Sequence, residues 1–175
     1  YLCAVMCTFA KCLLCFRCVL LLDVIEHLMS PEAFVDQLRI ASEMAPDVRL
    51  LISSGNVGFI VARIMHLFGQ FNYGKQGILD ITHTRLFTFQ TLKRLFEQGG
   101  FELVESRGIP APFPMVLGNT ITGKVLFALN KLLIKIWRNA FSYQIFYEFR
   151  PMPSLPFLLE NAVLHSKKRA KKILD

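Results

Sequence analysis

The stretch VLLLDVIEHLMSPEAF, residues 19–34, decides how this chain folds. Its apolar run, residues 19–22, stops abruptly at Asp23, and Glu26 and His27 follow three and four positions later. A short run of Val and Leu predicts a buried parallel β-strand that ends at the carboxyl edge of a sheet. Three ionisable side chains at that edge cost free energy if they are buried alone, so we expect them to face water, a ligand or a metal ion.

The rest of the chain alternates between predicted helices and predicted strands. Ser30 and Pro31 form a strong helix start, because serine caps a helix and proline suits its first position. Further strands are predicted at residues 48–53, 101–107 and 142–150, and further helices at residues 57–68 and 89–98. This alternation predicts an α/β layered sheet, in which ligands bind beyond the carboxyl ends of the strands.

Composition and charge limit the possible functions. The 175 residues suffice for one domain with a proper core. The formal net charge is +7, but five basic residues form one short terminal run, Lys167, Lys168, Arg169, Lys171 and Lys172. The remainder is close to neutral, so nucleic acid is not an expected partner. We divide the chain into a lead-in at residues 1–18, a domain at 19–150 with an insert at 108–140, and an extension with a basic tail at 151–175.

The lead-in is apolar and contains all five cysteines. Cys12, Cys15 and Cys18 have the spacing of an iron–sulfur site, but the fourth ligand and the following proline are missing, so we interpret them as incidental or buried thiols. The absence of cysteine after Cys18 fits a reducing, cytoplasmic compartment. The apolar sequence of residues 1–22, which includes the lead-in, is about as long as a bilayer is thick, but it contains Lys11 and Arg17.

The insert contains a second feature that a membrane could bind. Apolar residues recur at helical spacing between residues 124 and 138, and lysines and an arginine lie among them. Such a cationic amphipathic helix lies on a membrane, covers a substrate pocket or packs on its own domain. The alternative to an enzyme is therefore a non-enzymatic, membrane-associated fragment or binding module.

Three segments resemble a known family when they are taken in order. They are LLLDVIEHLMSPEAF, RLLISSGN and FNYGKQGILDITHTRLFTFQTLKRLFEQGGFELVE. Together they resemble the carboxyl-terminal half of class I S-adenosylmethionine-dependent methyltransferases, most closely the methyltransferase domains of bacterial bifunctional glycosyltransferase/methyltransferase proteins. The resemblance implies a partial Rossmann-like sheet with strands four to seven of the family, the last one antiparallel, flanking helices and a helical cap insert.

The same resemblance implies that part of the cofactor site is missing. The family's glycine-rich turn and the acidic residue that holds the ribose should precede residue 19, yet residues 1–18 contain no glycine, Asp or Glu. We therefore expect an N-terminally truncated methyltransferase domain with weak or absent cofactor binding. A smaller departure is Gly55, which stands where the family usually has proline before Asn56.

Two chemical roles for the Asp23, Glu26 and His27 cluster remain open beside a purely structural one. Either Glu26 or His27 acts as a general base, for which an imidazole with an ordinary pKa near 6.5 is well suited. Alternatively, the cluster joins His83 around a divalent metal ion that activates the acceptor hydroxyl. A structural role would come from the favourable position of carboxylates at a helix N-terminus.

The resemblance assigns candidate roles to seven residues. The catalytic candidates are Glu26, His27 and His83. The cofactor-binding candidates are Leu22 and Asp23, and the substrate-binding candidates are Asn56 and Arg85, with Asp80 or Glu26 as the expected ion-pair partner of Arg85. The implied reaction is methyl transfer from S-adenosylmethionine to an oxygen or other heteroatom of a small molecule or glycan precursor, with peripheral membrane contact as a further possibility.

Overall fold

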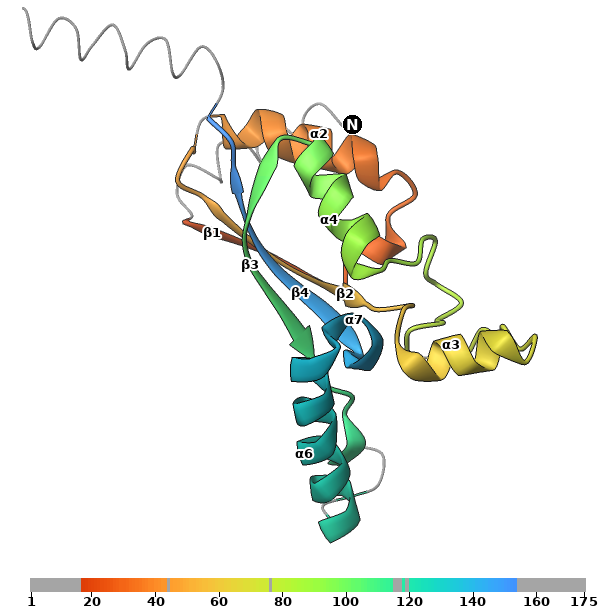
Figure 1. The fold of residues 1–175 in the computed structure, drawn as a ribbon. Helices are drawn as coiled ribbons and strands as arrows, with labels where there is room; N and C mark the ends of the chain where they lie inside the picture. Colours follow the sequence, from red (N-terminus) through yellow and green to blue (C-terminus); the bar gives the residue numbers. More distant parts are fainter. Residues whose placement is uncertain (1–16, 44, 76, 115–117, 119, 154–175) are drawn as a thin grey trace, which may run out of the picture.

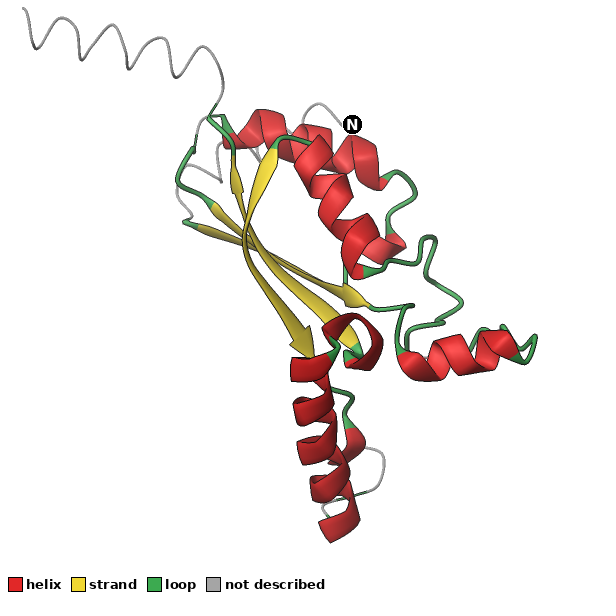
Figure 2. Cartoon of the chain, viewed as in Figure 1, coloured by secondary structure: helices red, strands yellow, loops and turns green. Residues whose placement is uncertain are grey.

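The fold is built on a four-stranded sheet with helices around it (Figures 1 and 2). The computed structural model describes residues 17–43, 45–75, 77–114, 118 and 120–153. The strands are β1 (Cys18–Leu22), β2 (Arg49–Gly55), β3 (Phe101–Ile109) and β4 (Gln144–Pro151), in the order β1-β2-β4-β3. β1 and β2 are parallel, whereas β4 runs antiparallel to both of its neighbours. The predicted α/β sheet with an antiparallel last strand is therefore confirmed.

The register of the strands brings their functional ends together. Leu22 of β1 pairs with Ser53 of β2, and Gly55 at the end of β2 pairs with Gln144 at the start of β4. Because β4 is antiparallel, its first residue lies at the edge where the two parallel strands end. The carboxyl edge of β1 and β2 thus receives side chains from a segment that is distant in sequence.

Two helices cover one face of the sheet (Figure 1). They are α2 (Pro31–Ser42) and α4 (Phe89–Gln98). Proline occupies the first position of α2 as predicted, and Thr88 caps α4 in a reciprocal pair with Thr91. The predicted boundaries of α4 are confirmed, and Gly99 and Gly100 follow its last residue.

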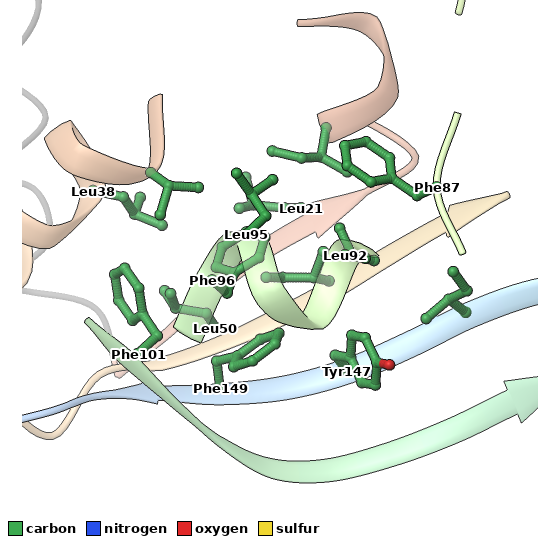
Figure 3. Close-up of a cluster of buried hydrophobic side chains, with 14 of the residues drawn as sticks. Leu21, Leu38, Leu50, Phe87, Leu92, Leu95, Phe96, Phe101, Tyr147 and Phe149 are labelled. Carbon is green, nitrogen blue, oxygen red and sulfur yellow. The ribbon is translucent and has the colours of Figure 1, made fainter. Parts of the chain in front are cut away.

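The main hydrophobic core lies between these two helices and the sheet (Figure 3). Phe96 of α4 stacks on Phe149 of β4 with ring centroids 4.9 Å apart, and its edge contacts Phe101 at 5.9 Å. Tyr147 is buried beside them and donates a hydrogen bond to the carbonyl of Phe89 at 2.7 Å. Aromatic side chains from α4 and three sheet positions therefore fix the helix on the sheet.

Three more helices of the described residues lie near the end of the sheet where β1 and β2 finish (Figure 1). They are α3 (Ile60–Leu67), α6 (Ile121–Ile136) and α7 (Arg138–Phe141), and α3 and α6 both project away from the sheet in Figure 1. The predicted helix of the insert is therefore present. No helix in the described part of the chain combines the length and the apolar character needed to cross a membrane.

The prediction of a buried strand at residues 19–22 is only half right. Leu21 is buried in the main core, but Leu20 and Leu22 point to the other face of the sheet and are 60% and 51% exposed. Their exposure follows from the alternation of side chains along a strand, because the described helices α2 and α4 cover one face only. β1 is also an edge strand of the described sheet and not a central one.

Several sequence predictions fall on residues that the structure does not describe. Most of the lead-in, with Cys12 and Cys15, lies outside the described residues, and so does the basic tail. Cys18 is described, and it is a free, exposed thiol at the start of β1, so of the two interpretations, an incidental or a buried thiol, burial does not hold for it. It precedes Leu20 by two residues and therefore shares the exposed face.

Tyr147 is expected to make stability depend on alkaline pH. Burial raises its pKa to about 12, whereas an unfolded tyrosine titrates near 10. As the pH rises from 10 towards 12, the unfolded chain releases this proton before the native chain does, so the free energy of unfolding falls. Tyr147→Phe lacks this proton and loses about 1 kcal/mol at neutral pH with the hydrogen bond to Phe89.

Urea unfolding between pH 7 and 11 measures this effect. The gap in unfolding free energy between the wild type and Tyr147→Phe should be largest at neutral pH and shrink above pH 10. Tyr73→Phe, at a half-exposed tyrosine, is the matched control and should follow the wild type at every pH. If the gap between wild type and Tyr147→Phe stays constant to pH 11, the pKa of Tyr147 is not raised in the native chain.

Candidate active site

A pocket of about 280 Å³ lies at the carboxyl edge of β1 and β2. Its walls come from the turn after β1, the end of β2, the loop before α4 and the start of β4. The lining residues are Asp23, Glu26, His27, Gly55, Gly77, Ile78, Asp80, His83, Tyr143 and Gln144. The predicted cluster at the end of β1 therefore faces a pocket, and His83 joins it there.

Asp23 is held in place by β2 and β4. Its backbone has a φ of 52°, a left-handed conformation that aspartate tolerates better than most residues. The Asp23 N–H donates to the carbonyl of Ser53 at 3.1 Å, and the Ser53 hydroxyl donates to Asp23 Oδ1 at 3.0 Å. Gln144 Nε2 donates to both carboxylate oxygens, at 3.1 and 2.9 Å. The carboxylate is thus fixed from two strands.

Glu26 is almost completely buried, with 2% of its surface exposed. It lies in a short 3-10 turn, η1 (Ile25–His27), and its Oε1 accepts a hydrogen bond from the Gly55 N–H at 3.4 Å. Its other carboxylate oxygen, Oε2, is buried and has no hydrogen-bond partner among the described residues. A buried carboxylate oxygen without a donor is costly, so its presence at a pocket indicates a place for a donor or a cation from a ligand.

Backbone carbonyls determine which ring nitrogen carries the proton in each of the two pocket histidines. His27 Nδ1 lies 3.2 Å from the carbonyl of Thr82, and His83 Nδ1 lies 3.0 Å from the carbonyl of Ile78. Because a carbonyl only accepts, each Nδ1 must donate, and in the neutral rings Nε2 keeps the lone pair. The ring centroids are 4.8 Å apart in an edge-to-face arrangement. Both rings are therefore oriented as proton acceptors at Nε2.

Hydrogen bonds join the loop before α4 to the turn that carries Glu26 and His27. The backbone carbonyl of Glu26 accepts hydrogen bonds from the N–H groups of Thr84 and Arg85, at 2.9 and 3.2 Å. The Thr84 hydroxyl donates to the same carbonyl and to that of Leu28. These bonds explain why His83 and His27 meet although they are far apart in sequence.

Two further ionisable groups of the pocket have shifted pKa values. Hydrogen bonds from the hydroxyl and N–H of Thr82 lower the pKa of the Asp80 carboxyl. Burial, and then the charge of Asp23, raises the pKa of the Tyr143 phenol. At neutral pH the pocket therefore contains an ionised Asp80 and a protonated Tyr143 that can donate a hydrogen bond.

Three predicted site residues do not line the pocket. Leu22 is half exposed on the open face of the sheet. Asn56 is fully buried, and its side chain is used structurally: it donates to the carbonyls of Asn139 and Ser142 and accepts from the Gly58 N–H. These bonds fix the chain after β2. They occupy the side chain of Asn56, for which a substrate contact was predicted.

Arg85 also differs from its prediction. Its partner is Glu32 at the start of α2 and not Asp80 or Glu26. The hydrogen bond from Arg85 lowers the pKa of the Glu32 carboxyl. The guanidinium also lies over the ring of Phe87, 5.6 Å from its centroid. Arg85 thus links α2 to the loop before α4 at the surface, outside the pocket.

The metal alternative finds no support in the described residues. Among them, no three His, Cys, Asp or Glu side chains converge closely enough to bind a metal ion. The Asp23 carboxylate is already bonded to the Ser53 hydroxyl and the Gln144 amide. The predicted set of Asp23, Glu26, His27 and His83 shares a pocket but does not form a coordination sphere.

Sequence reasoning missed Tyr143 and Gln144. A signal was present, because an antiparallel strand predicted at residues 142–150 begins at the edge where the parallel strands end. No residue of α6 lines the pocket, so the described part of the predicted cap does not cover it.

Comparison with known proteins concerns the fold. No protein-family model matches the sequence, and no curated protein matches it either. Among solved structures, the chain is similar to an S-adenosylmethionine-dependent methyltransferase from Archaeoglobus fulgidus. The TM-score is 0.46 at 19% identity over 82% of this chain and 64% of that one. This chain therefore spans less than two thirds of that protein.

Two other solved structures are similar to a lesser degree. One is the [4+2]-cyclase SpnF, with a TM-score of 0.41 and 9% identity over 79% of this chain and 54% of that one. The other is a Haemonchus contortus phosphoethanolamine N-methyltransferase in complex with phosphomonomethylethanolamine and S-adenosylhomocysteine, with a TM-score of 0.39 and 13% identity over 79% and 34%. Two of the three structures are named as methyltransferases.

Proposed function

We propose that this chain is part of an S-adenosylmethionine-dependent methyltransferase that acts on an oxygen or other heteroatom of a small molecule or glycan precursor. The observation that carries the proposal is the charge of the pocket. Asp23, Glu26 and Asp80 contribute three carboxylates, and the described lining contains no lysine or arginine. A pocket of this charge attracts a cationic ligand. S-adenosylmethionine carries a sulfonium and an ammonium group.

The carboxylates of this pocket fit the positively charged part of S-adenosylmethionine. Glu26 Oε2 is a buried acceptor that lacks a donor, and the Asp23 carboxylate is fixed by Ser53 and Gln144. S-adenosylmethionine, when bound, supplies an electrophilic methyl group on its sulfonium. We assign Asp23 and Glu26 to the binding of its cationic part, because a preorganised carboxylate needs no reorganisation to meet a positive charge.

His27 is the proposed general base. The Thr82 carbonyl fixes its Nδ1 proton, so Nε2 accepts the proton of an acceptor hydroxyl as the new bond forms. His83 supports the orientation of His27 through the edge-to-face contact, and the protonated Tyr143 donates a hydrogen bond to the acceptor. Glu26 remains the second candidate for the base, since it lines the same pocket.

The same proposal includes weak cofactor binding by this chain. Residues 1–18 contain no glycine and no acidic residue, so they offer neither a glycine-rich turn for the methionine part nor a carboxylate for the ribose. We place the reaction in the cytoplasm, because the sequence has no cysteine after Cys18.

Titration with S-adenosylmethionine and S-adenosylhomocysteine tests the proposal. The sulfonium charge should make S-adenosylmethionine bind about 2- to 5-fold more tightly, the range expected for a partly exposed ion pair. In NMR spectra the imidazole signals of His27 and His83 should shift, and those of His66 on α3 should not. Equal affinities together with unshifted pocket histidines would refute the assignment of this pocket.

Replacing Glu26 by methionine is expected to separate binding from stability. The variant removes the buried Oε2, which has no partner, together with Oε1, whose hydrogen bond from the Gly55 N–H is long at 3.4 Å, so the free energy of unfolding should rise by about 1 kcal/mol. It should also abolish the preference for S-adenosylmethionine over S-adenosylhomocysteine. Glu32→Met, at an exposed carboxylate that pairs with Arg85, is the matched control and should change neither quantity by much. A Glu26→Met protein that is less stable than the wild type would contradict the geometry.

A further inference from the structure

One exposed face of α6 is apolar along the whole helix. It consists of residues spaced by three or four positions, which places them on one side of a helix. We call these residues the apolar stripe: Ile121, Val125, Leu129, Leu132 and Ile136. Their exposed fractions lie between 49 and 82%. Helices of soluble proteins normally bury such a stripe, so its exposure over 16 residues calls for a partner.

The helix cannot turn its apolar stripe inward, because its opposite face is anchored. Asn130 is buried; its Nδ2 donates to the carbonyl of Phe141 at 2.9 Å and its Oδ1 accepts from the Ala111 N–H at 3.0 Å. Gly123 is buried on the same face. These contacts attach α6 to α7 and to the segment after β3, and they leave the apolar stripe directed away from the protein.

The charges beside the apolar stripe have one sign. Lys124, Lys131 and Lys135 are exposed and follow one another at spacings of seven and four, so they form a line along one border of the stripe. Residues 108–143 contain no Asp or Glu, and neither do residues 57–79, which include α3. α3 has no buried residue, and like α6 it exposes apolar side chains, here Val61, Ile64 and Leu67, with Phe68 directly after its last residue. Both helices project from the same end of the sheet (Figure 1).

We propose that α6, with α3 beside the same end of the sheet, lies on the surface of an anionic membrane with its apolar stripe against the lipid. An exposed apolar face bordered by lysines, without acidic residues, matches the acyl boundary and the negative headgroups of such a surface. Trp137 at the end of α6 is 53% exposed, and tryptophan favours the interfacial region. A second copy of the chain would bring the same line of lysines against itself, which favours the lipid surface over self-association. This inference does not depend on the proposed methyl transfer.

The full chain provides its own spectroscopic probe, because Trp137 is its single tryptophan. Vesicles of phosphatidylcholine with phosphatidylglycerol should shift the tryptophan emission to the blue and carry the protein upward in flotation. Pure phosphatidylcholine vesicles should do so much less. Replacing Lys131 and Lys135 by glutamine should lower the partition coefficient on anionic vesicles about fivefold per lysine.

The decisive comparison is between variants of the full chain, all of which keep the lead-in and the basic tail. The double variant Val125→Glu and Leu132→Glu should lower the partition coefficient at least tenfold. Ile40→Glu, at an exposed apolar residue of α2, should bind like the wild type, and circular dichroism should show that all variants are folded. Unchanged binding by the double variant overturns the proposal. So does an emission that responds to protein concentration and not to anionic vesicles, which would indicate self-association.

Discussion

Replacing His27 by alanine is expected to lower the rate of methyl transfer by about 10²- to 10⁴-fold, the usual contribution of a positioned general base. The physical reason is the Nδ1–carbonyl contact with Thr82, which leaves the lone pair of Nε2 for the acceptor proton. The measurement is transfer of a labelled methyl group from S-adenosylmethionine at high concentration to a panel of glycan precursors and small alcohols. The affinity for S-adenosylmethionine should change little, because Asp23 and Glu26 are assigned to bind its positive charge.

The controls for this prediction use the other histidines. His66→Ala, on the projecting helix α3, should keep the full rate, because His66 does not line the pocket. His83→Ala should give an intermediate loss, since His83 contacts His27 edge to face. If His27→Ala retains the rate and Glu26→Gln loses it, the base is Glu26. Circular dichroism must show that each variant keeps its fold.

The position of the pocket could be predicted from the sequence because it depends on local patterns. The apolar run at residues 19–22 ends at Asp23, and the next predicted strand ends at Ser53, so parallel pairing alone brings these ends to one edge. The 3-10 turn η1 begins only three residues after the end of β1, which keeps Glu26 and His27 at that edge. Order along the chain was therefore enough to place this part of the site.

The partners of individual side chains could not be predicted, because they are set by tertiary contacts. Arg85 pairs with Glu32, which is 53 positions away, since the loop before α4 passes the start of α2. The Asn56 side-chain amide donates to the carbonyls of Asn139 and Ser142, which lie more than 80 positions further along the chain. Nothing in the local sequence distinguishes such structural bonds from a substrate contact.

Replacing Phe96 by alanine is expected to lower the free energy of unfolding by about 3–5 kcal/mol, as is usual for a fully buried phenylalanine. The deletion leaves a cavity between α4 and the sheet, and it removes the stacked contact with Phe149 and the edge contact with Phe101. Small domains have a total stability of only about 5–15 kcal/mol, so the loss should be a large part of the whole. Urea unfolding followed by circular dichroism measures it.

The matched control is Phe68→Ala, at a phenylalanine that is 76% exposed after α3, where we expect a change within about 0.5 kcal/mol. The comparison bears on the site as well as on stability, because α4 follows directly on the loop that carries His83 and that is bonded to the Glu26 carbonyl. A looser α4 should therefore broaden the NMR signals of both pocket histidines in Phe96→Ala, whereas His27→Ala should leave the unfolding midpoint nearly unchanged. If Phe96→Ala loses no more stability than Phe68→Ala, then α4 does not pack on β4 as described, and the support of the pocket by this helix is wrong.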